Sequence, residues 1–342
     1  MIPLPSLPTA RGPVSRRLLE ALRTAPRPGV ELSPVADVDP WSEDAQLALY
    51  VGFELRYRGF AAVDPAWEDD AALVALVRTL GDAFLDAVRH EVGPVAATTP
   101  AGVRAAMVAC ATGDGPSLSG WMGEHGTIDH LREFAAHRSL YQLKEADPHT
   151  WALPRLPAGR AKAAFVEIQA DEYGNGHPGE AHQELFAVTL RSLGLDDTYG
   201  AYLDLVPAPT LATVNLLSLF GASRRWLGAC VGHLALFEMT SVGPMGRYAD
   251  AIRRLSGSEA AARFYDVHVV ADQHHQRLAL DDMVVPFVAD HPAMAADVVF
   301  GARALGAVEG RFTEHLLAHW TAGRTSLRRP LVPADVRAAS AA

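Results

Sequence analysis

Residues 264–276 have the sequence FYDVHVVADQHHQ, which places His268, Asp272 and His275 at offsets of four and seven residues. In an α-helix, which turns about 100° per residue, these three side chains fall within roughly 60° of arc. Imidazole and carboxylate groups on one helical face suit a first-row transition metal, with zinc, iron and manganese all open. A solvated polar face is the alternative, and the valines between the three residues argue against it.

A second combination of carboxylate and imidazole lies upstream of this stretch, at Glu172 and His182. The pattern predicts a helix that ends near Tyr173, a break at Gly174-Asn175-Gly176, and a new helix with His182 in its first turn. If the two helices are roughly collinear, Glu172 and His182 face the same space. Otherwise Glu172 caps a turn and His182 is an ordinary surface or core histidine.

Glu238 is a third unusual residue, because it stands in a strongly apolar helical stretch with no positive side chain within four residues. A buried carboxylate without a partner is costly. Two readings remain open for it: a metal ligand, or a partner for an arginine from another helix.

Helical periodicity extends over most of the chain, whereas runs typical of strands are almost missing from its second half. The sequence therefore predicts an all-α fold. The expected helices cover residues 45–57, 67–92, 102–112, 128–145, 161–173, 179–192, 210–240, 256–285 and 293–322.

The length of 342 residues and a hydrophobic content of 49% suit one large domain or one domain with an extension. We predict four parts. They are a proline-rich N-terminal extension that serves as an arm (residues 1–40), additional N-terminal helices packed on the core (41–125), a core (126–325) and a C-terminal tail (326–342).

The formal charge of −10 and the absence of a long Lys/Arg run argue against nucleic acid and anionic membranes as partners. A small molecule or a protein is the better expectation. Cys110 and Cys230 both stand in apolar stretches, which excludes a disulfide framework and a cysteine-rich metal site. No stretch approaches the ~20 apolar residues of a membrane span, and residues 1–13 lack a signal-like segment, so we expect a cytoplasmic protein.

Taken together, these residues resemble the ligand pattern of the haem-oxygenase-like diiron oxidases and oxygenases, a family of iron-containing redox enzymes. In that family a Glu and a His come from one core helix, a second Glu from a later helix, and a His-x3-Asp-x2-His set from a third. The resemblance covers roughly residues 128–322, and one departure is Val267, which stands where an acidic residue is expected. The matching residues are Glu172, His182, Glu238, His268, Asp272 and His275.

The resemblance implies a haem-oxygenase-like helical bundle with extra N-terminal helices, in which residues 126–325 hold two non-haem iron ions and use O2 as a co-substrate. Glu172, Glu238 and Asp272 are its expected catalytic carboxylates, with Glu238 as the bridging one. Three carboxylates and two divalent ions leave a formal charge near +1, which an oxygen-derived anion can offset. Glu145 is either a further ligand or a surface residue beside Pro148 at the end of a helix.

By the same resemblance, we expect oxidation of a small amine, amino-acid or acyl substrate by N-oxygenation, desaturation or carbon–carbon cleavage. An external electron donor, and a homodimer formed through the N-terminal third, are compatible with this expectation. One alternative is haem degradation on the same scaffold, with His130 or His137 as the haem ligand. Another is a non-catalytic protein that binds a metal or a partner on the same fold.

Overall fold

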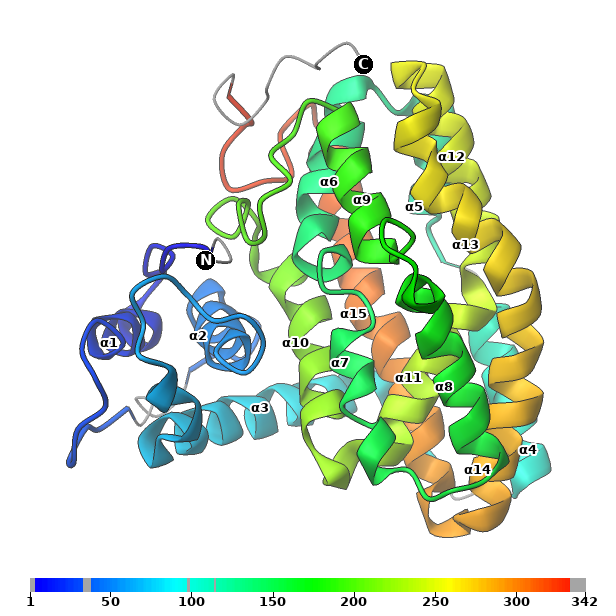
Figure 1. Ribbon diagram of the computed structural model, residues 1–342, viewed down its shortest axis with the longest axis horizontal. Helices are drawn as coiled ribbons and strands as arrows, with labels where there is room; N and C mark the ends of the chain where they lie inside the picture. The colour runs from blue at the N-terminus through cyan, green and yellow to red at the C-terminus, as the bar shows by residue number, and fades with distance from the viewer. Residues whose placement is uncertain (1–3, 33–37, 97–98, 114, 333–342) are drawn as a thin grey trace.

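The computed structural model describes residues 4–32, 38–96, 99–113 and 115–332, and within these ranges it contains helices but no strand. Figure 1 shows an upright bundle of long helices with a smaller group of N-terminal helices on one side. The predicted all-α fold is confirmed. Its longer helices are α1 (Pro13–Ala21), α2 (Glu43–Glu54), α3 (Ala71–Val92), α4 (Pro100–Ala111), α5 (Leu118–His125), α6 (Ile128–Gln142), α8 (Arg160–Glu172), α9 (His182–Ser192), α10 (Ala208–Ala222), α11 (Leu227–Thr240), α12 (Val242–Ser256), α13 (Glu259–Arg277) and α15 (Ala295–Thr321).

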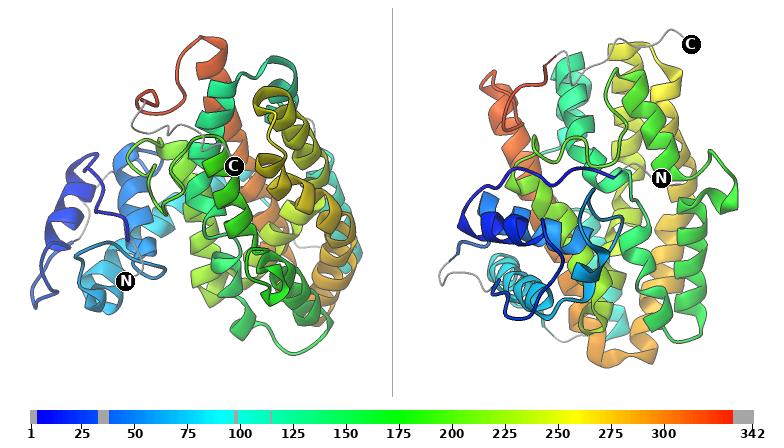
Figure 2. Two further views of the ribbon diagram at one scale, coloured as in Figure 1. Left: turned by 45° about the horizontal axis from the view of Figure 1, so that its top comes forward. Right: turned by 60° about the vertical axis from the view of Figure 1, so that its left-hand side comes forward.

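The N-terminal helices pack against one side of the bundle, as both views of Figure 2 show. Helix α1 contacts α2, α2 contacts α10, and α3 contacts α15. Residues 1–40 were expected to form an arm, but α1 belongs to the packed structure. Leu18 and Leu22 are fully buried, and the carboxylate of Asp44 on α2 accepts hydrogen bonds from the backbone N–H groups of Val14 and Ser15. This contact caps α1 and joins it to α2.

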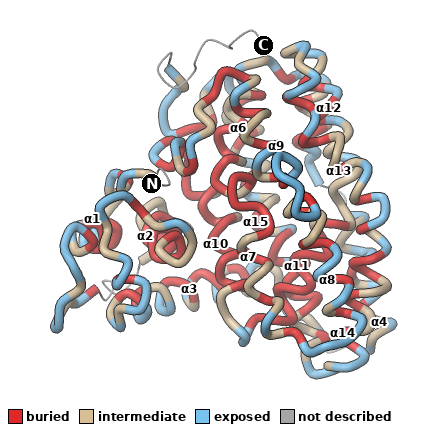
Figure 3. The backbone as a smooth tube through the Cα atoms, viewed as in Figure 1, coloured by how far each residue is buried: buried red, intermediate tan, exposed pale blue. Residues whose placement is uncertain are grey.

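Helices α11 and α15 approach each other closely in the middle of the bundle, where Figure 3 shows mostly buried backbone. A Cβ atom on Gly232 would lie 1.8 Å from the carbonyl oxygen of Val298, and one on Gly301 would lie 2.0 Å from that of Ala229. Both positions therefore require glycine. The close crossing fixes the register of α11, the helix that carries Glu238.

Two of the predicted helices are divided or distorted in the structure. Residues 210–240 form two helices, because the chain breaks after Ala222 and the side chain of Ser223 accepts a hydrogen bond from the N–H of Arg225. In addition, α13 continues after Arg277 as a π-helix over Leu278–Val284, a type of distortion that is frequent beside functional sites.

The predicted C-terminal tail is partly packed, since Ser326 and Leu327 are buried. Residues 333–342 lie outside the described part of the chain, and the four-part division as a whole stays a prediction. In the described ranges no single helix is both long and apolar enough to cross a membrane. Glu259–Asp290 and Pro292–Thr321 meet that test only as a pair bent by 113°.

Candidate metal centre

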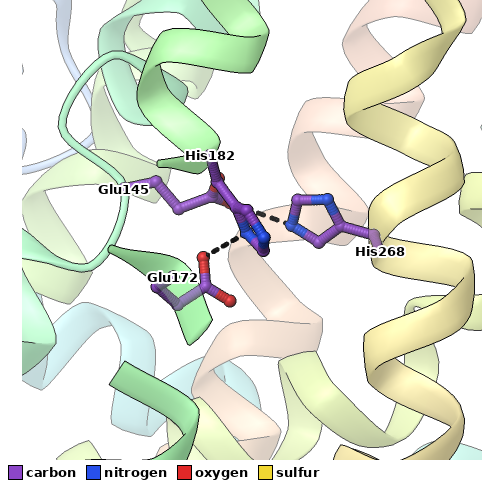
Figure 4. Close-up of side chains that lie close together, drawn as sticks. All are labelled: Glu145, Glu172, His182 and His268. Carbon is purple, nitrogen blue, oxygen red and sulfur yellow. Dashed lines mark hydrogen bonds and ion pairs between the residues drawn. The ribbon is translucent and has the colours of Figure 1, made fainter. Parts of the chain in front are cut away.

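A tight break between two helices brings Glu172 and His182 together. Glu172 is the last residue of α8 and His182 is the first residue of α9. Gly174 adopts a φ of +63°, and a Cβ atom there would lie 2.5 Å from the backbone nitrogen of Ala181, so only glycine permits this turn. As a result, Nδ1 of His182 lies 2.7 Å from Oε2 of Glu172 (Figure 4).

Glu145 and His268 complete a first cluster around this pair, as Figure 4 shows. Potential ligand atoms of the four residues lie within 4.8 Å of one another. Oε1 of Glu145 is 3.7 Å from Nε2 of His268, and its Oε2 is 4.0 Å from Nδ1 of His182. Glu145 comes from the turn between α6 and the short helix α7 (Asp147–Thr150) and is only 6% exposed. It is therefore not the surface residue that one reading of the sequence allowed.

Glu238, Asp272 and His275 form a second cluster, also with potential ligand atoms within 4.8 Å of one another. Nδ1 of His275 lies 3.1 Å from Oε2 of Glu238 and 3.4 Å from Oδ1 of Asp272. All three residues are buried. The partner of Glu238 is thus an imidazole and not the arginine that the sequence left open. The structure accordingly brings all seven sequence candidates into two neighbouring clusters.

In two of the histidines, the ring nitrogen that faces away from the cluster contacts an oxygen atom outside it. Nδ1 of His268 lies 2.8 Å from the carbonyl oxygen of Phe264, which leaves Nε2 toward Glu145. Nε2 of His275 lies 2.8 Å from Oδ2 of Asp171, which leaves Nδ1 toward Glu238. Such outer contacts fix the tautomer and the ring orientation of a metal-binding histidine. Asp171 was not among the residues expected from the sequence, although it directly precedes Glu172.

Charges in the two clusters shift one another's protonation. Burial raises the pKa of Glu238 to about 8, even though His275 hydrogen-bonds to it. Burial opposes ionisation of Glu172 as well, but the imidazoles of His182 and His268 lower its pKa to about 2. Burial disfavours the charge of His275, yet the nearby carboxylates of Asp272 and Glu238 raise its pKa to about 11. In the metal-free protein, bound protons thus offset the negative charge of the carboxylates that a metal cation would otherwise offset.

The residues present fit a pair of divalent transition-metal ions. Oε2 of Glu145 and Oδ1 of Asp272 are buried and have no hydrogen-bond partner among the described residues. Unpaired buried carboxylate oxygens are costly unless a cation binds them. Four carboxylates carry a formal charge of −4, which two divalent ions would neutralise, and mixed imidazole and carboxylate ligands suit iron.

A small pocket of about 50 Å3 lies between the clusters and is lined by Glu172, Glu238, His268 and Asp272. His149 also lines it, and its Nε2 lies 3.2 Å from Nδ1 of His233 behind the pocket. Burial lowers the pKa of His149 to about 3, so this histidine is neutral. Sequence analysis missed this pair, because the two residues are far apart in the chain and meet only where α7 contacts the bundle.

The two histidines considered for haem have other roles. Nδ1 of His137 lies 2.7 Å from Oγ1 of Thr210, and its Nε2 lies 3.0 Å from Oγ of Ser326. Nδ1 of His130 accepts a hydrogen bond from the N–H of Thr127 in the capping box of α6. This use of their ring nitrogens argues against haem ligation.

The fold and the site are those of an all-α protein with buried, carboxylate- and histidine-rich clusters in the bundle core that could hold metal ions. The family of iron-containing redox enzymes matches residues 132–310, more than half of the chain, and the protein belongs to this haem-oxygenase-like family. It is also similar to a nitrosourea synthase of Streptomyces achromogenes subsp. streptozoticus, with 28% identity over 133 residues. That alignment covers 39% of this chain and 28% of the relative.

Proposed function

We propose that this protein is a non-haem diiron oxidase or oxygenase that uses O2 to oxidise a small amine, amino-acid or acyl substrate. The observation that carries the proposal is the pair of adjoining buried clusters, in which seven ligand-type side chains converge and two carboxylate oxygens accept no hydrogen bond from the described residues. The similarity to a nitrosourea synthase adds support for redox chemistry at nitrogen.

Each cluster would hold one iron ion. Glu145, His182 and His268 would bind the first ion, and Glu238, Asp272 and His275 the second. Glu172 is the better candidate for a bridging carboxylate than Glu238, which was the expectation from the sequence. Glu172 belongs to the first cluster, yet it also interacts electrostatically with His275 of the second.

Iron(II) ions held by these residues would supply the electrons that O2 needs for a two-electron reduction. In an N-oxygenation, one oxygen atom enters the amine and the other leaves as water, so an external donor must restore the two electrons after each turnover. The protein's own groups orient the ligands through Asp171 and the carbonyl of Phe264. Leu234 and Phe237 line the pocket and limit the entry of water.

Anaerobic loading with iron(II), followed by metal analysis and rapid mixing with O2, tests the proposal. We expect two irons per chain and rapid O2 consumption with a transient visible absorption. The variants His268→Ala and Glu238→Ala should each lose iron while they keep the helical circular dichroism of the parent. A preparation that binds one haem, or that reacts with O2 equally well without iron, would overturn the proposal.

Helix α8 and helix α13 also provide matched controls. Glu167 and His274 lie on the same two helices as the ligands, but they are about half exposed and pair with each other at 2.9 Å. Glu167→Ala and His274→Ala should therefore leave the iron content unchanged. Loss of iron from these variants would mean that the ligand variants report general damage to the helices.

A further inference from the structure

A larger pocket of about 350 Å3 lies directly beside the small metal pocket. The two share five lining residues, so they lie on either side of the same side chains. The inner compartment is only about 50 Å3, which admits O2 and a reacting group but not the body of a substrate. The shared residues are Tyr141, Gln142, Phe237, Ser241 and Met245. We call the larger pocket the outer chamber.

The outer chamber reaches the protein surface at its other end. Pro116, Ser117 and Gly306 line it and are exposed, whereas Phe134 and Tyr265, which also line it, are buried. A substrate can therefore enter from solvent between α5 and α15 and extend toward the metal ligands. Most of the walls are aromatic or aliphatic, which favours an apolar substrate body.

One ion pair interrupts these apolar walls. Nη1 and Nη2 of Arg138 donate to the two oxygens of Glu309 at 2.9 and 2.7 Å. Phe312 packs beneath the guanidinium group, with its ring centre 4.3 Å away, and both charged side chains are less than a quarter exposed. Arg138 and Glu309 are the only charged residues among the described residues that line the chamber.

The chemistry of this pair selects the group that can bind it. The guanidinium group has five N–H donors, of which the pair uses two, and each oxygen of Glu309 keeps a second lone pair. A lone carboxylate on Arg138 would lie close to the negative Glu309, and a lone ammonium on Glu309 would lie close to the positive Arg138. A zwitterion satisfies both charges at once.

We propose that the outer chamber binds a free α-amino acid with an apolar or extended side chain. Its carboxylate binds Arg138, its ammonium group binds Glu309, and its side chain runs past Tyr141 and Phe237 to the metal pocket. This inference rests on the proposed diiron function and narrows its substrate from amines, amino acids and acyl compounds to amino acids. Arg138 and Glu309 are the residues that determine this specificity.

Three probes of equal chain length test the inference on protein loaded with Zn(II), which holds the site without redox chemistry. L-Norleucine carries both charges, hexanoic acid only the carboxylate, and hexylamine only the ammonium group. By calorimetric titration we expect L-norleucine to bind at least about tenfold more tightly than either other probe. Equal or tighter binding of the acid or the amine, or binding of none of the three, would overturn the inference.

Two sets of variants place the binding site. Arg138→Gln with Glu309→Gln removes both charges together and leaves no unpaired ion. It should abolish the preference for L-norleucine and keep the bound zinc. Gly306→Phe adds a side chain in the chamber, whereas Gly310→Phe adds one on the same helix outside the described lining. A Cβ atom at either position would lie in open space. Only Gly306→Phe should weaken L-norleucine binding.

If the parent protein holds no metal pair, the diiron proposal fails. If it holds the pair but shows no preference for L-norleucine, only the substrate inference fails.

A separate observation concerns the turn that carries Glu145, residues 143–146, which we call the ligand turn. Ala146 adopts a φ of +73°, an unfavourable conformation for alanine that neighbouring contacts must hold in place. These contacts come from residues that precede the family match. Nη2 of Arg58 donates to the carbonyl oxygen of Leu143 at 3.0 Å and also to Oε1 of Gln183, the residue after His182, at 2.8 Å.

A buried ion pair holds the next residue of the ligand turn. Nζ of Lys144 lies 2.7 Å from Oε2 of Glu54 on α2, and both side chains are only 1% exposed. The hydroxyl of Tyr199 donates to the other oxygen of Glu54 at 2.7 Å, and the ring centre of Tyr57 lies 4.2 Å from Nζ. Every charge in this group is therefore compensated.

We infer that Glu54 is a positioning residue for the metal site: through Lys144 it keeps Glu145 in the first cluster. The N-terminal helices thus contribute to metal binding although they contain none of the seven ligands. This inference also rests on the proposed diiron site, because it concerns how tightly one of its two ions is held.

Metal titration of a charge-free variant tests the role of Glu54. Glu54→Gln with Lys144→Met removes the pair without leaving a buried charge, and cobalt(II) absorption reports each ion as it binds. We expect one ion to bind as in the parent and the other at least about tenfold more weakly. Unchanged binding of both ions to a folded variant would overturn the inference, whereas a parent protein that binds fewer than two ions would instead contradict the diiron proposal.

Glu43 provides a matched control for Glu54. It lies on the same helix and pairs with the fully buried Arg11 at 2.7 Å, but this pair does not reach the ligand turn. Glu43→Gln should lower the thermal stability and leave both cobalt(II) ions bound with parental affinity. Equal weakening of cobalt binding in both variants would show that loss of stability alone explains the effect.

Discussion

Oδ2 of Asp171 lies 2.8 Å from Nε2 of His275, on the ring edge opposite the Nδ1 that faces Glu238 at 3.1 Å. A carboxylate at this position keeps the proton on Nε2 and leaves the lone pair of Nδ1 for a metal ion. Asp171 itself is about one-third exposed and touches solvent. Its other oxygen accepts a hydrogen bond from Nδ2 of the exposed Asn175, so Asp171 connects the second cluster to the protein surface.

Replacement of Asp171 should weaken metal binding without loss of the fold. In Asp171→Asn the side chain can no longer attract the ring proton as strongly, and we expect the affinity of the second cluster to fall about 10- to 100-fold. Zinc titration monitored by calorimetry measures this change. Glu167→Gln, on the same helix but paired with the exposed His274, is the control and should bind zinc normally.

Glu145 should affect metal binding and the stability of the metal-free protein in opposite directions. Burial and the nearby Glu172 raise the pKa of Glu145, which means that its ionised form is destabilised when no cation is present. Glu145→Ala should therefore raise the melting temperature in the presence of a chelator and reduce iron binding from two ions to one. A variant that melts lower in chelator and still holds two ions would contradict both the ligand role and the electrostatic argument.

The sequence predicted those parts of the site that depend on local geometry. The spacing of His268, Asp272 and His275 within one helix determines which face they share, so α13 was identified directly. Glu145 could not be assigned in the same way, because its burial depends on the contact between Lys144 and Glu54, 90 positions apart in the chain.

Helix ends were harder to predict than helices. The break after Ala222 lacks a proline. It becomes intelligible only from the structure, in which the guanidinium group of Arg155 donates to the carbonyl oxygens of Gly221 and Ala222 at the end of α10. The burial of α1 was missed for a similar reason. Its cap comes from Asp44, a residue of the following helix, and not from its own N-terminal sequence.

The crossing of α11 and α15 should tolerate no added methyl group. Gly232→Ala would place a Cβ atom 1.8 Å from the carbonyl oxygen of Val298, so the two helices must separate. We expect a loss of about 1–3 kcal/mol in the free energy of unfolding, measured by urea denaturation. Gly310→Ala is the control, since open space surrounds that position and alanine favours a helix, so this variant should be as stable as the parent or slightly more so.

Metal binding should become tighter as the pH rises, because the ion must displace protons from the second cluster. Burial raises the pKa of Glu238 to about 8. Burial opposes the charge of His275, but the nearby carboxylates of Asp272 and Glu238 raise its pKa to about 11. Both groups therefore hold protons in the metal-free protein at about pH 6, and Glu238 begins to lose its proton as the pH approaches about 8. Because binding releases these protons, the apparent affinity for the metal ion increases with pH. Zinc titrations in buffers of different ionisation enthalpy, at about pH 6 and about pH 8, should show proton release at both pH values and more of it at the lower one. Binding without proton release at either pH would contradict this account of the site.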